Sequence, residues 1–283
     1  MRRAVYILLF LLIANSQWLT AGITVLTWNT FRMGQFAKPD KNEVLQYLMT
    51  QDADVICLQE VDVYKNDEFL TLPDVKQTLS KKYPYSYIDF SVYNKRHQYG
   101  TMVWAKYPLI NKQSIHYETR GNLSNRCDMV MGKDTLRLIN NHLESYSFTP
   151  SDLAEKDSLH TYEGWLSVFK RLKNKWERAF LLRNKQAQVV RREIEASPYP
   201  VVVVGDFNAM PLSYAYWHIS SGLHDAWSYC HPWEWGATCE KKGYGLRIDY
   251  ILCSDPLKPT SCFVPDASGS DHKPVVATLE WVY

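Results

Sequence analysis

Residues 201–208 read Val-Val-Val-Val-Gly-Asp-Phe-Asn, and this stretch constrains the fold more than any other. Four consecutive β-branched residues favour an extended strand that is apolar on both faces, which is typical of a strand buried within a sheet. The run ends abruptly at Gly205, and Asp206 and Asn208 follow. The stretch therefore predicts a buried strand that delivers polar side chains to the edge of a sheet.

Five further apolar runs have the same form, a short buried-strand pattern that ends in polar residues. They are Ile23 to Trp28, Val55 to Leu58, Thr101 to Trp104, Leu136 to Ile139 and Ile248 to Leu252. Between them lie helical patterns at Glu43 to Met49 and from Trp165 to Glu195, where apolar residues recur at spacings of three and four. Strands that alternate with helices predict a mixed α/β fold.

The bulk composition indicates one globular domain. The 283 residues contain no Pro/Gly/Ser-rich linker or compositional break in the middle of the chain. Because 46% of the residues are hydrophobic and 14% are aromatic, a large core can be buried, which excludes a disordered or fibrous protein. A net charge of +2 is too small to indicate a general nucleic-acid or membrane-surface binder, although charge can gather locally.

The N-terminus has the order of a signal peptide, since Arg2 and Arg3 precede an apolar run from Ala4 to Ala14. A run of this length would cross only about half of a bilayer core, which needs roughly 20 helical residues. Cleavage after Ala21 would place Leu19 where a small residue is preferred, so an uncleaved anchor stays open. We assign residues 1–21 to a signal peptide or N-terminal membrane anchor and residues 22–283 to one domain. The protein is expected outside the cytoplasm, either periplasmic, secreted or anchored to a membrane and facing outward.

The six cysteines of an exported chain can form disulfides. Cys230 and Cys239 are separated by a short loop, as are Cys253 and Cys262, and we expect at least one of these pairs to be oxidised. Cys57 lies inside an apolar run and is expected to be a buried free thiol. The sequence has no CxxC spacing, so a structural zinc site is not expected.

Carboxylates, carboxamides and histidines follow the predicted strands. They are Asn29, Glu60, His142, Asp206, Asn208, Asp249, Asp271 and His272. Each has a structural explanation when taken alone, such as a turn for Asn208 or an ion pair between Asp249 and Arg247. Because strand ends converge at one rim of a sheet, the whole set instead predicts a site of oxygen ligands and proton-transfer groups. Such a site suits Mg²⁺ or Mn²⁺ better than zinc and indicates metal-assisted hydrolysis.

The order of these residues resembles the endonuclease/exonuclease/phosphatase superfamily, from Thr27 to the C-terminus. The matching pieces are Thr27-Trp28-Asn29, Leu58-Gln59-Glu60, Asn141-His142-Leu143, Gly205-Asp206-Phe207-Asn208, Ile248-Asp249-Tyr250 and Ser270-Asp271-His272. The resemblance implies a DNase I-like fold, a four-layer α/β/β/α sandwich of two mixed β-sheets flanked by helices. It makes residues 22–283 the catalytic domain, and the chain is also similar to exported bacterial members.

The resemblance also implies a metal centre. Glu60 would be the principal metal ligand, with Asn29 and Asp271 completing or supporting the metal shell. Some members carry an acidic residue two positions after the first Asn, where this chain has Phe31. We therefore expect one tightly bound ion, Mg²⁺ or Mn²⁺.

The remaining residues take catalytic roles by the same resemblance. Asp206 would orient and deprotonate the attacking water, and Asn208 would help to hold water and a phosphate oxygen. Asp249 would pair with His272 and favour its protonated form, while His142 would contact the scissile phosphate from the other side. The family itself leaves open whether Asp206 or His272 is the main base.

The implied function is a divalent-metal-dependent hydrolase of phosphoester bonds, with a phosphodiesterase or endonuclease favoured and nucleic acid as the leading substrate. From Trp165 to Glu195, nine basic residues face three acidic residues, which indicates attraction to a polyanion or anionic lipid, or a solvated helix face. The aromatic segment from Trp227 to Trp235 could stack bases or a sugar ring, enter a membrane interface, or form a small hydrophobic cluster.

Two other functions stay open. One is a phosphatase or phospholipase C-like enzyme that acts on inositol phosphates or lipid head groups. The other is a non-catalytic surface binding protein on the same fold. We expect a monomer that binds a phosphoester substrate, such as a nucleic acid, and that could associate with a membrane through its N-terminal segment.

Overall fold

The computed structural model describes residues 22–34, 38–66, 68–119, 121–146, 162–241 and 244–282, with the side chains of the long helix described from Lys170 onward. The predicted signal peptide or anchor, residues 1–21, lies outside these ranges. Within them, no helix has both the length and the apolar character needed to cross a membrane.

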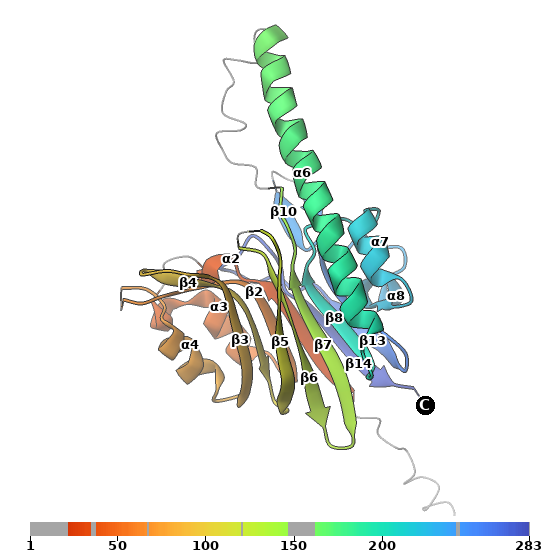
Figure 1. The fold of residues 1–283 in the computed structure, drawn as a ribbon. Helices are drawn as coiled ribbons and strands as arrows, with labels where there is room; N and C mark the ends of the chain where they lie inside the picture. The colour runs from red at the N-terminus through yellow and green to blue at the C-terminus, as the bar shows by residue number, and fades with distance from the viewer. Residues whose placement is uncertain are drawn as a thin grey trace, which may run out of the picture.

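Two mixed sheets form the centre of the molecule (Figure 1). The strands are β1 (Ile23–Asn29), β2 (Val55–Tyr64), β3 (Tyr85–Tyr93), β4 (His97–Ala105), β5 (Leu109–His116), β6 (Leu123–Met131), β7 (Asp134–His142), β8 (Val201–Asp206), β9 (His224–Asp225), β10 (Cys239–Lys241), β11 (Tyr244–Leu246), β12 (Asp249–Cys253), β13 (Leu257–Phe263) and β14 (Val275–Trp281). The helices are α2 (Phe31–Gly34), α3 (Glu43–Thr50), α4 (Leu72–Leu79), α6 (Tyr162–Glu195), α7 (Tyr214–Ser220) and α8 (Ala226–Cys230), with a 3₁₀ turn at Pro39–Lys41.

Each large sheet has six strands. The first has the order β13-β14-β1-β2-β4-β3 and the second β5-β6-β7-β8-β12-β9, while β10 and β11 form a separate hairpin. The pairs β1–β2 and β7–β8 are parallel, and the other pairs in the two sheets are antiparallel. The predicted mixed character of both sheets is confirmed.

The core fills the space between the sheets and both outer faces. Alternation along β8 sends Val202 and Val204 into the cluster between the sheets, and Val201 and Val203 into the cluster beneath the helices. The first sheet packs its outer face on α3 and α4, and the second packs on α6 and α7. The layers therefore run helix, sheet, sheet, helix, which confirms the predicted four-layer sandwich.

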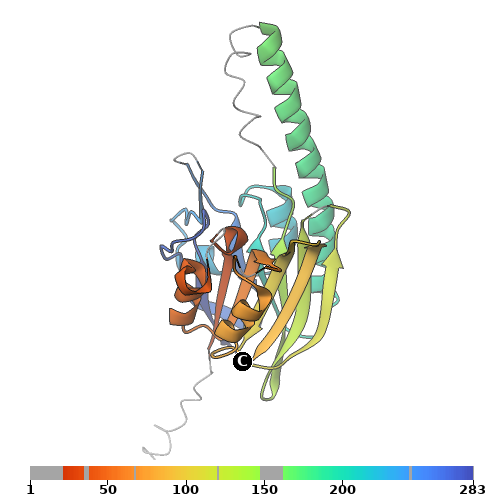
Figure 2. The same cartoon turned by 90° about the vertical axis from the view of Figure 1, so that its left-hand side faces the viewer.

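Helix α6 has 34 residues, and its two halves differ in their surroundings. The C-terminal half packs on the second sheet through residues spaced three and four apart, which include Ala179, Arg183, Ala187 and Val190. The N-terminal half rises beyond the sheets into solvent (Figures 1 and 2). It projects from the same end of the sandwich as the segment that follows β7.

The expected disulfides are absent, because all six cysteines are free thiols in the structure. Cys239 lies beside His272, whereas Cys230 packs on the core cluster that contains Cys253 and Cys262. Cys253 belongs to the second sheet and Cys262 to the first, and the Cys253 thiol donates to the carbonyl of Leu257 at 3.5 Å. The prediction that Cys230/Cys239 or Cys253/Cys262 is paired is therefore not met here. Cys57 is buried, as predicted.

Candidate active site

Three of the predicted residues lie side by side at one edge of the second sheet. Strands β7 and β8 run parallel and place His142 opposite Asp206. Strand β12 runs antiparallel to β8 on its other side and places Asp249 opposite Asp206. Asp206 is therefore the middle residue of a row across three neighbouring strands.

Two residues of the site, Glu60 and Asn208, have left-handed backbone conformations that set the direction of their side chains. A bulge in β2 between Leu58 and Val61 contains Glu60, whose φ is 50°. Asn208, which follows β8, has a φ of 49°. Left-handed conformations are tolerated by Asn but unfavourable for Glu, so the surrounding structure must hold Glu60 in place. The bulge also turns the Glu60 side chain out of the regular alternation of β2.

The loop that carries His272 is tied to the first strand. The indole Nε1 of Trp28 donates to the carbonyl of His272 at 2.8 Å, and the Ser270 hydroxyl donates to the carbonyl of Asn29 at 2.7 Å. The backbone N–H of His272 donates to that same hydroxyl at 3.0 Å. These bonds bring the C-terminal motif next to Asn29 of the first sheet.

A first cluster surrounds Glu60. The Asn29 amide nitrogen donates to Glu60 Oε1 at 3.2 Å and to Asp206 Oδ2 at 2.9 Å, and His142 Nε2 lies 3.4 Å from Glu60 Oε1. Burial alone would raise the pKa of the Glu60 carboxyl, but the hydrogen bonds of His142 and Asn29 and the positive charge of His142 lower it to about 2. Burial works in the opposite direction on His142, whose pKa is nevertheless raised by Glu60 and Asp206.

A second cluster surrounds His272. Its Nδ1 lies 2.9 Å from Asp249 Oδ2, and its Nε2 lies 3.9 Å from Asp206 Oδ2. The Thr238 hydroxyl donates to the same Asp249 oxygen at 2.6 Å. Although burial opposes a charged imidazole, the carboxylates of Asp249 and Asp206 raise the pKa of His272 well above its ordinary value. The predicted contact between Asp249 and His272 is thus present in the structure.

Asn208 and Asp271 occupy different positions around these clusters. The Asn208 backbone N–H donates to Asp206 Oδ1 at 2.7 Å, and its amide nitrogen donates to Asp206 Oδ2 at 3.1 Å and to the carbonyl of Leu143 at 3.0 Å. The Asp271 carboxylate groups with Cys239 and His272 rather than with Glu60. Seven of the eight predicted residues therefore meet around Asp206, and Asp271 lies beyond His272.

The donor set fits a hard divalent cation. Glu60, His142 and Asp206 offer ligand atoms within 4.8 Å of one another, and Asp206 also belongs to a second such group with Asp249 and His272. A Glu60 carboxyl with a pKa of about 2 is ionised at neutral pH and is ready to bind metal without first losing a proton. The Asn29 amide nitrogen faces both carboxylates, so this residue positions Glu60 and Asp206 in the present arrangement.

Sequence reasoning missed Tyr99 and Thr238. The Tyr99 ring centroid lies 6.4 Å from that of His142, and burial together with the negative charge of Glu60 raises the pKa of its hydroxyl. Thr238 bonds Asp249 and also accepts hydrogen bonds from the backbone N–H groups of Ile248 and Asp249. Neither residue follows a predicted strand, so the strand-end pattern gave no signal for them.

Comparison with known proteins agrees with this geometry. The sequence profile described as the Endonuclease/Exonuclease/phosphatase family matches residues 26–272, which include Asn29, Glu60 and every other site residue. This chain belongs to that family. No curated protein sequence matches it significantly.

Solved structures of other members share the fold at low identity. An endonuclease/exonuclease/phosphatase from Beutenbergia cavernae superposes with a TM-score of 0.67 at 16% identity, covering 92% of this chain and 72% of that one. TDP2 from D. rerio, complexed with a single-strand DNA product, gives 0.62 at 17% identity, covering 92% and 99%. Sphingomyelinase C from Streptomyces griseocarneus gives 0.59 at 16% identity, covering 91% and 99%.

Membership of the endonuclease/exonuclease/phosphatase family makes this chain a phosphoester hydrolase. Family enzymes use divalent metals, and the clusters around Glu60 and Asp206 supply side chains able to hold one. The fold places both clusters at one end of the sandwich, where the strand-end motifs meet.

Proposed function

We propose that this protein is a metal-dependent phosphodiesterase that uses water as the nucleophile. The observation that supports this proposal best is the position of Asp206, which belongs to both ligand clusters and so lies between two imidazoles. Phosphodiester hydrolysis needs a base for water and positive charge on the phosphate oxygens, because those oxygens already carry negative charge. A buried carboxylate between two histidines whose pKa values are raised by neighbouring carboxylates supplies both requirements.

The proposed roles follow from these contacts. Glu60 would hold one Mg²⁺ or Mn²⁺ ion, with Asn29 in support, and such an ion would supply charge neutralisation at a phosphate oxygen. Asp206 orients water and accepts its proton. In its protonated form, His142 donates a hydrogen bond to a phosphate oxygen.

His272 completes the proposed site from the C-terminal side. Asp249 accepts from its Nδ1 at 2.9 Å, which leaves Nε2 as the donor toward substrate. Asn208 binds both oxygens of Asp206 and so fixes the direction in which that carboxylate can accept a proton.

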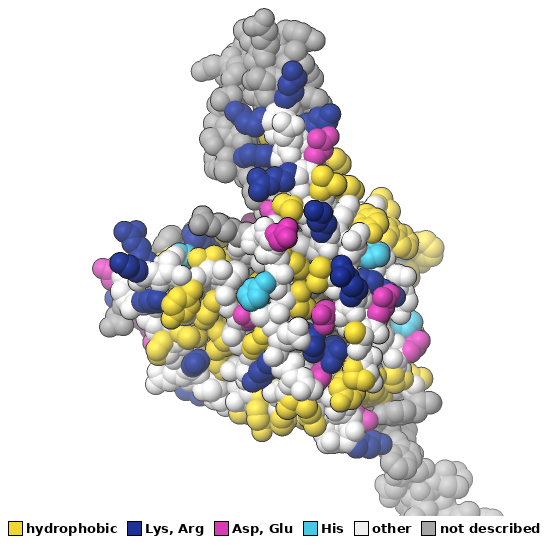
Figure 3. All heavy atoms as spheres, viewed as in Figure 1, with side chains coloured by type: hydrophobic (Ala, Val, Ile, Leu, Met, Phe, Trp, Pro, Cys, Tyr) yellow, Lys and Arg dark blue, Asp and Glu magenta, His cyan; other side chains and the backbone are white. Residues whose placement is uncertain are grey.

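We further propose a nucleic acid as the substrate. Basic side chains are distributed along the part of α6 that rises beyond the sheets (Figure 3), and exposed rings such as Trp233 and Trp235 are available for base stacking. A structural relative, TDP2 from D. rerio, has been captured with a single-strand DNA product. Inositol phosphates and lipid head groups remain the competing substrates.

We also propose that the protein is an exported monomer. The support for export is the order of residues 1–21, with two arginines before an apolar run. If that segment is retained, it would add a membrane attachment to a domain that acts outside the cytoplasm.

The purified protein should be assayed against bis-p-nitrophenyl phosphate, plasmid DNA, RNA, inositol phosphates and sphingomyelin. We expect diester cleavage that stops with EDTA and returns with Mg²⁺ or Mn²⁺, because the Glu60 carboxylate is a hard oxygen ligand. Full activity in EDTA would refute metal dependence. Turnover of inositol phosphate or sphingomyelin alone would refute the nucleic-acid substrate, and no turnover with any metal would favour a binding protein.

A further inference from the structure

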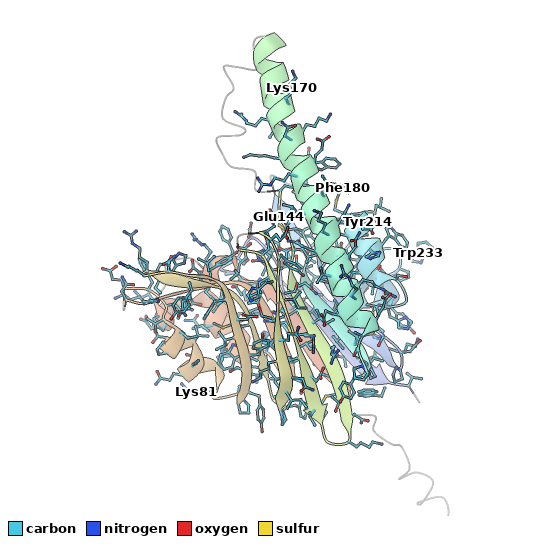
Figure 4. All side chains as sticks on the ribbon, in the orientation of Figure 1. Lys81, Glu144, Lys170, Phe180, Tyr214 and Trp233 are labelled. Atoms are coloured by element: carbon cyan, nitrogen blue, oxygen red, sulfur yellow. The ribbon has the colours of Figure 1, made fainter. Side chains whose placement is uncertain are left out.

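Cys239 is the first residue of β10 and lies next to His272, yet it has no part in the proposed hydrolysis. The hairpin of β10 and β11 lies at the end of the sandwich from which α6 projects (Figures 1 and 2). Figure 4 marks this end by Glu144, which follows His142 by two residues. Cys239 therefore lies at the active-site end of the molecule.

The backbone holds Cys239 directly opposite His272 in an isolated antiparallel bridge. The two hydrogen bonds of the bridge, of 3.4 and 2.6 Å, join the residues on either side of this pair and not the pair itself. Opposed residues of such a non-hydrogen-bonded pair carry their side chains on the same face, with Cβ atoms about 4.5 to 5.5 Å apart. The thiol and the imidazole are therefore brought together by the backbone.

Asp271 supplies a third donor atom to this pair. The Cys239 sulfur, a ring nitrogen of His272 and a carboxylate oxygen of Asp271 all lie within 4.8 Å of one another. Oδ1 of Asp271 is buried and, among the residues that the structure describes, has no hydrogen-bond partner. Because a buried carboxylate oxygen without a partner is unfavourable, this atom is available to a bound cation.

The three donors differ in kind from those around Glu60. A thiolate, an imidazole and a carboxylate are the usual ligands of zinc, whereas Mg²⁺ prefers oxygen ligands. Tetrahedral zinc holds its ligand atoms about 3.5 Å apart, so small side-chain rotations would bring this group to the required spacing. The group therefore suits a softer ion than the one expected at Glu60.

The burial of the three residues gives the site one open side. Cys239 and His272 are almost completely buried, whereas Asp271 is partly exposed. An ion would therefore enter past Asp271, and the thiol would meet it from the protected side.

We propose that Cys239, Asp271 and His272 form an inhibitory zinc site that is separate from the Mg²⁺ or Mn²⁺ site at Glu60. The inhibition rests on the proposed function, in which His272 donates a hydrogen bond to the substrate. An imidazole that binds zinc is neutral and has one ring nitrogen occupied. Zinc on Nε2 would remove the donor toward the substrate, and zinc on Nδ1 would displace Asp249.

The first experiment measures metal binding without turnover, in excess Mg²⁺. Co²⁺ is the probe, because it takes zinc's place at cysteine-containing sites and gives a thiolate-to-cobalt absorption band in the near ultraviolet. We expect this band in wild type and its loss in Cys239→Ala. Cys230→Ala is the matched control, since Cys230 packs on the core cluster and not beside His272, and it should keep the band.

The second experiment measures inhibition of bis-p-nitrophenyl phosphate hydrolysis by zinc in saturating Mg²⁺, with each variant normalised to its own zinc-free rate. The half-inhibitory zinc concentration should rise at least about ten-fold in Cys239→Ala and in Asp271→Asn, and stay within about two-fold of wild type in Cys230→Ala. Thermal melts without zinc establish that each variant is folded. Asp271→Asn changes a partly exposed residue and decides the matter if Cys239→Ala does not fold.

Absence of the cobalt band in wild type would overturn the site. Equal zinc inhibition of wild type and Cys239→Ala would also overturn it, and a cobalt band without zinc inhibition would overturn its inhibitory role. Absence of turnover in wild type with Mg²⁺ or Mn²⁺ would instead refute the proposed function. The cobalt spectrum still decides the metal site in that case, because it needs no catalysis.

Discussion

Glu60 is in a left-handed conformation, and its side chain contacts an amide and an imidazole. The contact with His142 keeps the carboxylate charged, and the contact with Asn29 fixes its orientation. His272 has a different environment, since its partners are Asp249 and Asp206 rather than Glu60. Replacement of Glu60 and replacement of His272 should therefore change different properties of the protein.

Replacement of Glu60 by Gln should weaken metal binding, because it removes the ionised ligand with the pKa of about 2. Replacement of His272 by Ala should leave metal affinity nearly unchanged and lower turnover by about 10² to 10⁴. Titration calorimetry with Mn²⁺ and steady-state kinetics separate the two effects. An equal loss of metal affinity in both variants would show that the proposed division of roles is wrong.

The Glu60–His142 pair also predicts a pH dependence of stability in EDTA. The pKa of His142 is raised on folding, so its contribution is complete below its ordinary pKa and is lost as pH rises through the folded value. The pKa of Glu60 is lowered to about 2, so its contribution is complete above its ordinary pKa of 4.5 and is lost as pH falls toward 2. The pair should therefore stabilise the metal-free protein most between about pH 4.5 and 6.5.

We expect Glu60→Gln to lower the free energy of unfolding by about 2 kcal/mol at pH 5.5 and by clearly less at pH 9. Urea denaturation at the two pH values measures this difference. A loss that is independent of pH would mean that His142 is not charged through its contact with Glu60.

Among the elements, β7 and β8 leave no space between them for a side chain at Gly205. A Cβ at this position would come within 2.1 Å of the carbonyl oxygen of Asn141, and the φ of Gly205 is 119°. Because the adjacent residues are Asp206 and His142, this close approach sets the spacing of the catalytic row. Any side chain at Gly205 would have to push the two strands apart.

Gly205→Ala should destabilise the fold by about 3 kcal/mol or more and nearly abolish activity. Gly222→Ala is the matched control, since Gly222 also has a positive φ, 73°, but its Cβ would meet no atom within 4 Å. We expect the control to cost about 1 kcal/mol and to keep its activity. Thermal denaturation and a diesterase assay compare them, and similar behaviour of the two variants would contradict the steric explanation.

The elements that were predictable from sequence are interior strands. β1, β2, β4, β7, β8 and β12 each contain an apolar run that is buried on both faces, and each was predicted. The edge strands were missed, because an edge strand such as β3 is only partly buried along its whole length and has no such run. Two interior strands were also missed: β6 (Leu123–Met131) has polar residues throughout its sequence and so no apolar run, and the burial of β14 alternates in a short pattern.

Most residues of the candidate site were predictable for the same reason, because they lie at the ends of interior strands that the sequence predicts. Tyr99 lies on β4 of the first sheet and His142 on β7 of the second, so their contact depends on the packing of the two sheets, and Thr238 reaches Asp249 from a loop. Contacts of this kind depend on tertiary structure and leave no local pattern. The grouping of Asp271 with Cys239 also depends on a tertiary contact, the isolated antiparallel bridge between Cys239 and His272.

For the whole molecule, the state of the thiols can be measured. Five of the six cysteines are buried and Cys230 is half-buried, so an oxidant would have little access to them in the folded protein. We expect all six thiols to react when protein from its native compartment is denatured without reductant. Fewer than six reactive thiols would show that a disulfide forms in that compartment, in contrast to the six free cysteines of the structure.

The pairing of β14 with β1 joins the last strand of the described domain to its first. A ribosome delivers Glu60, His142 and Asp206 well before it delivers His272, and His272 is fixed only when its loop reaches Trp28. Residues 275–281 must then add their strand beside β1 before the site is complete. A nascent chain therefore lacks the histidine that closes its site. The contacts of the His272 loop and of β14 therefore predict that the site assembles only after translation has passed the last strand.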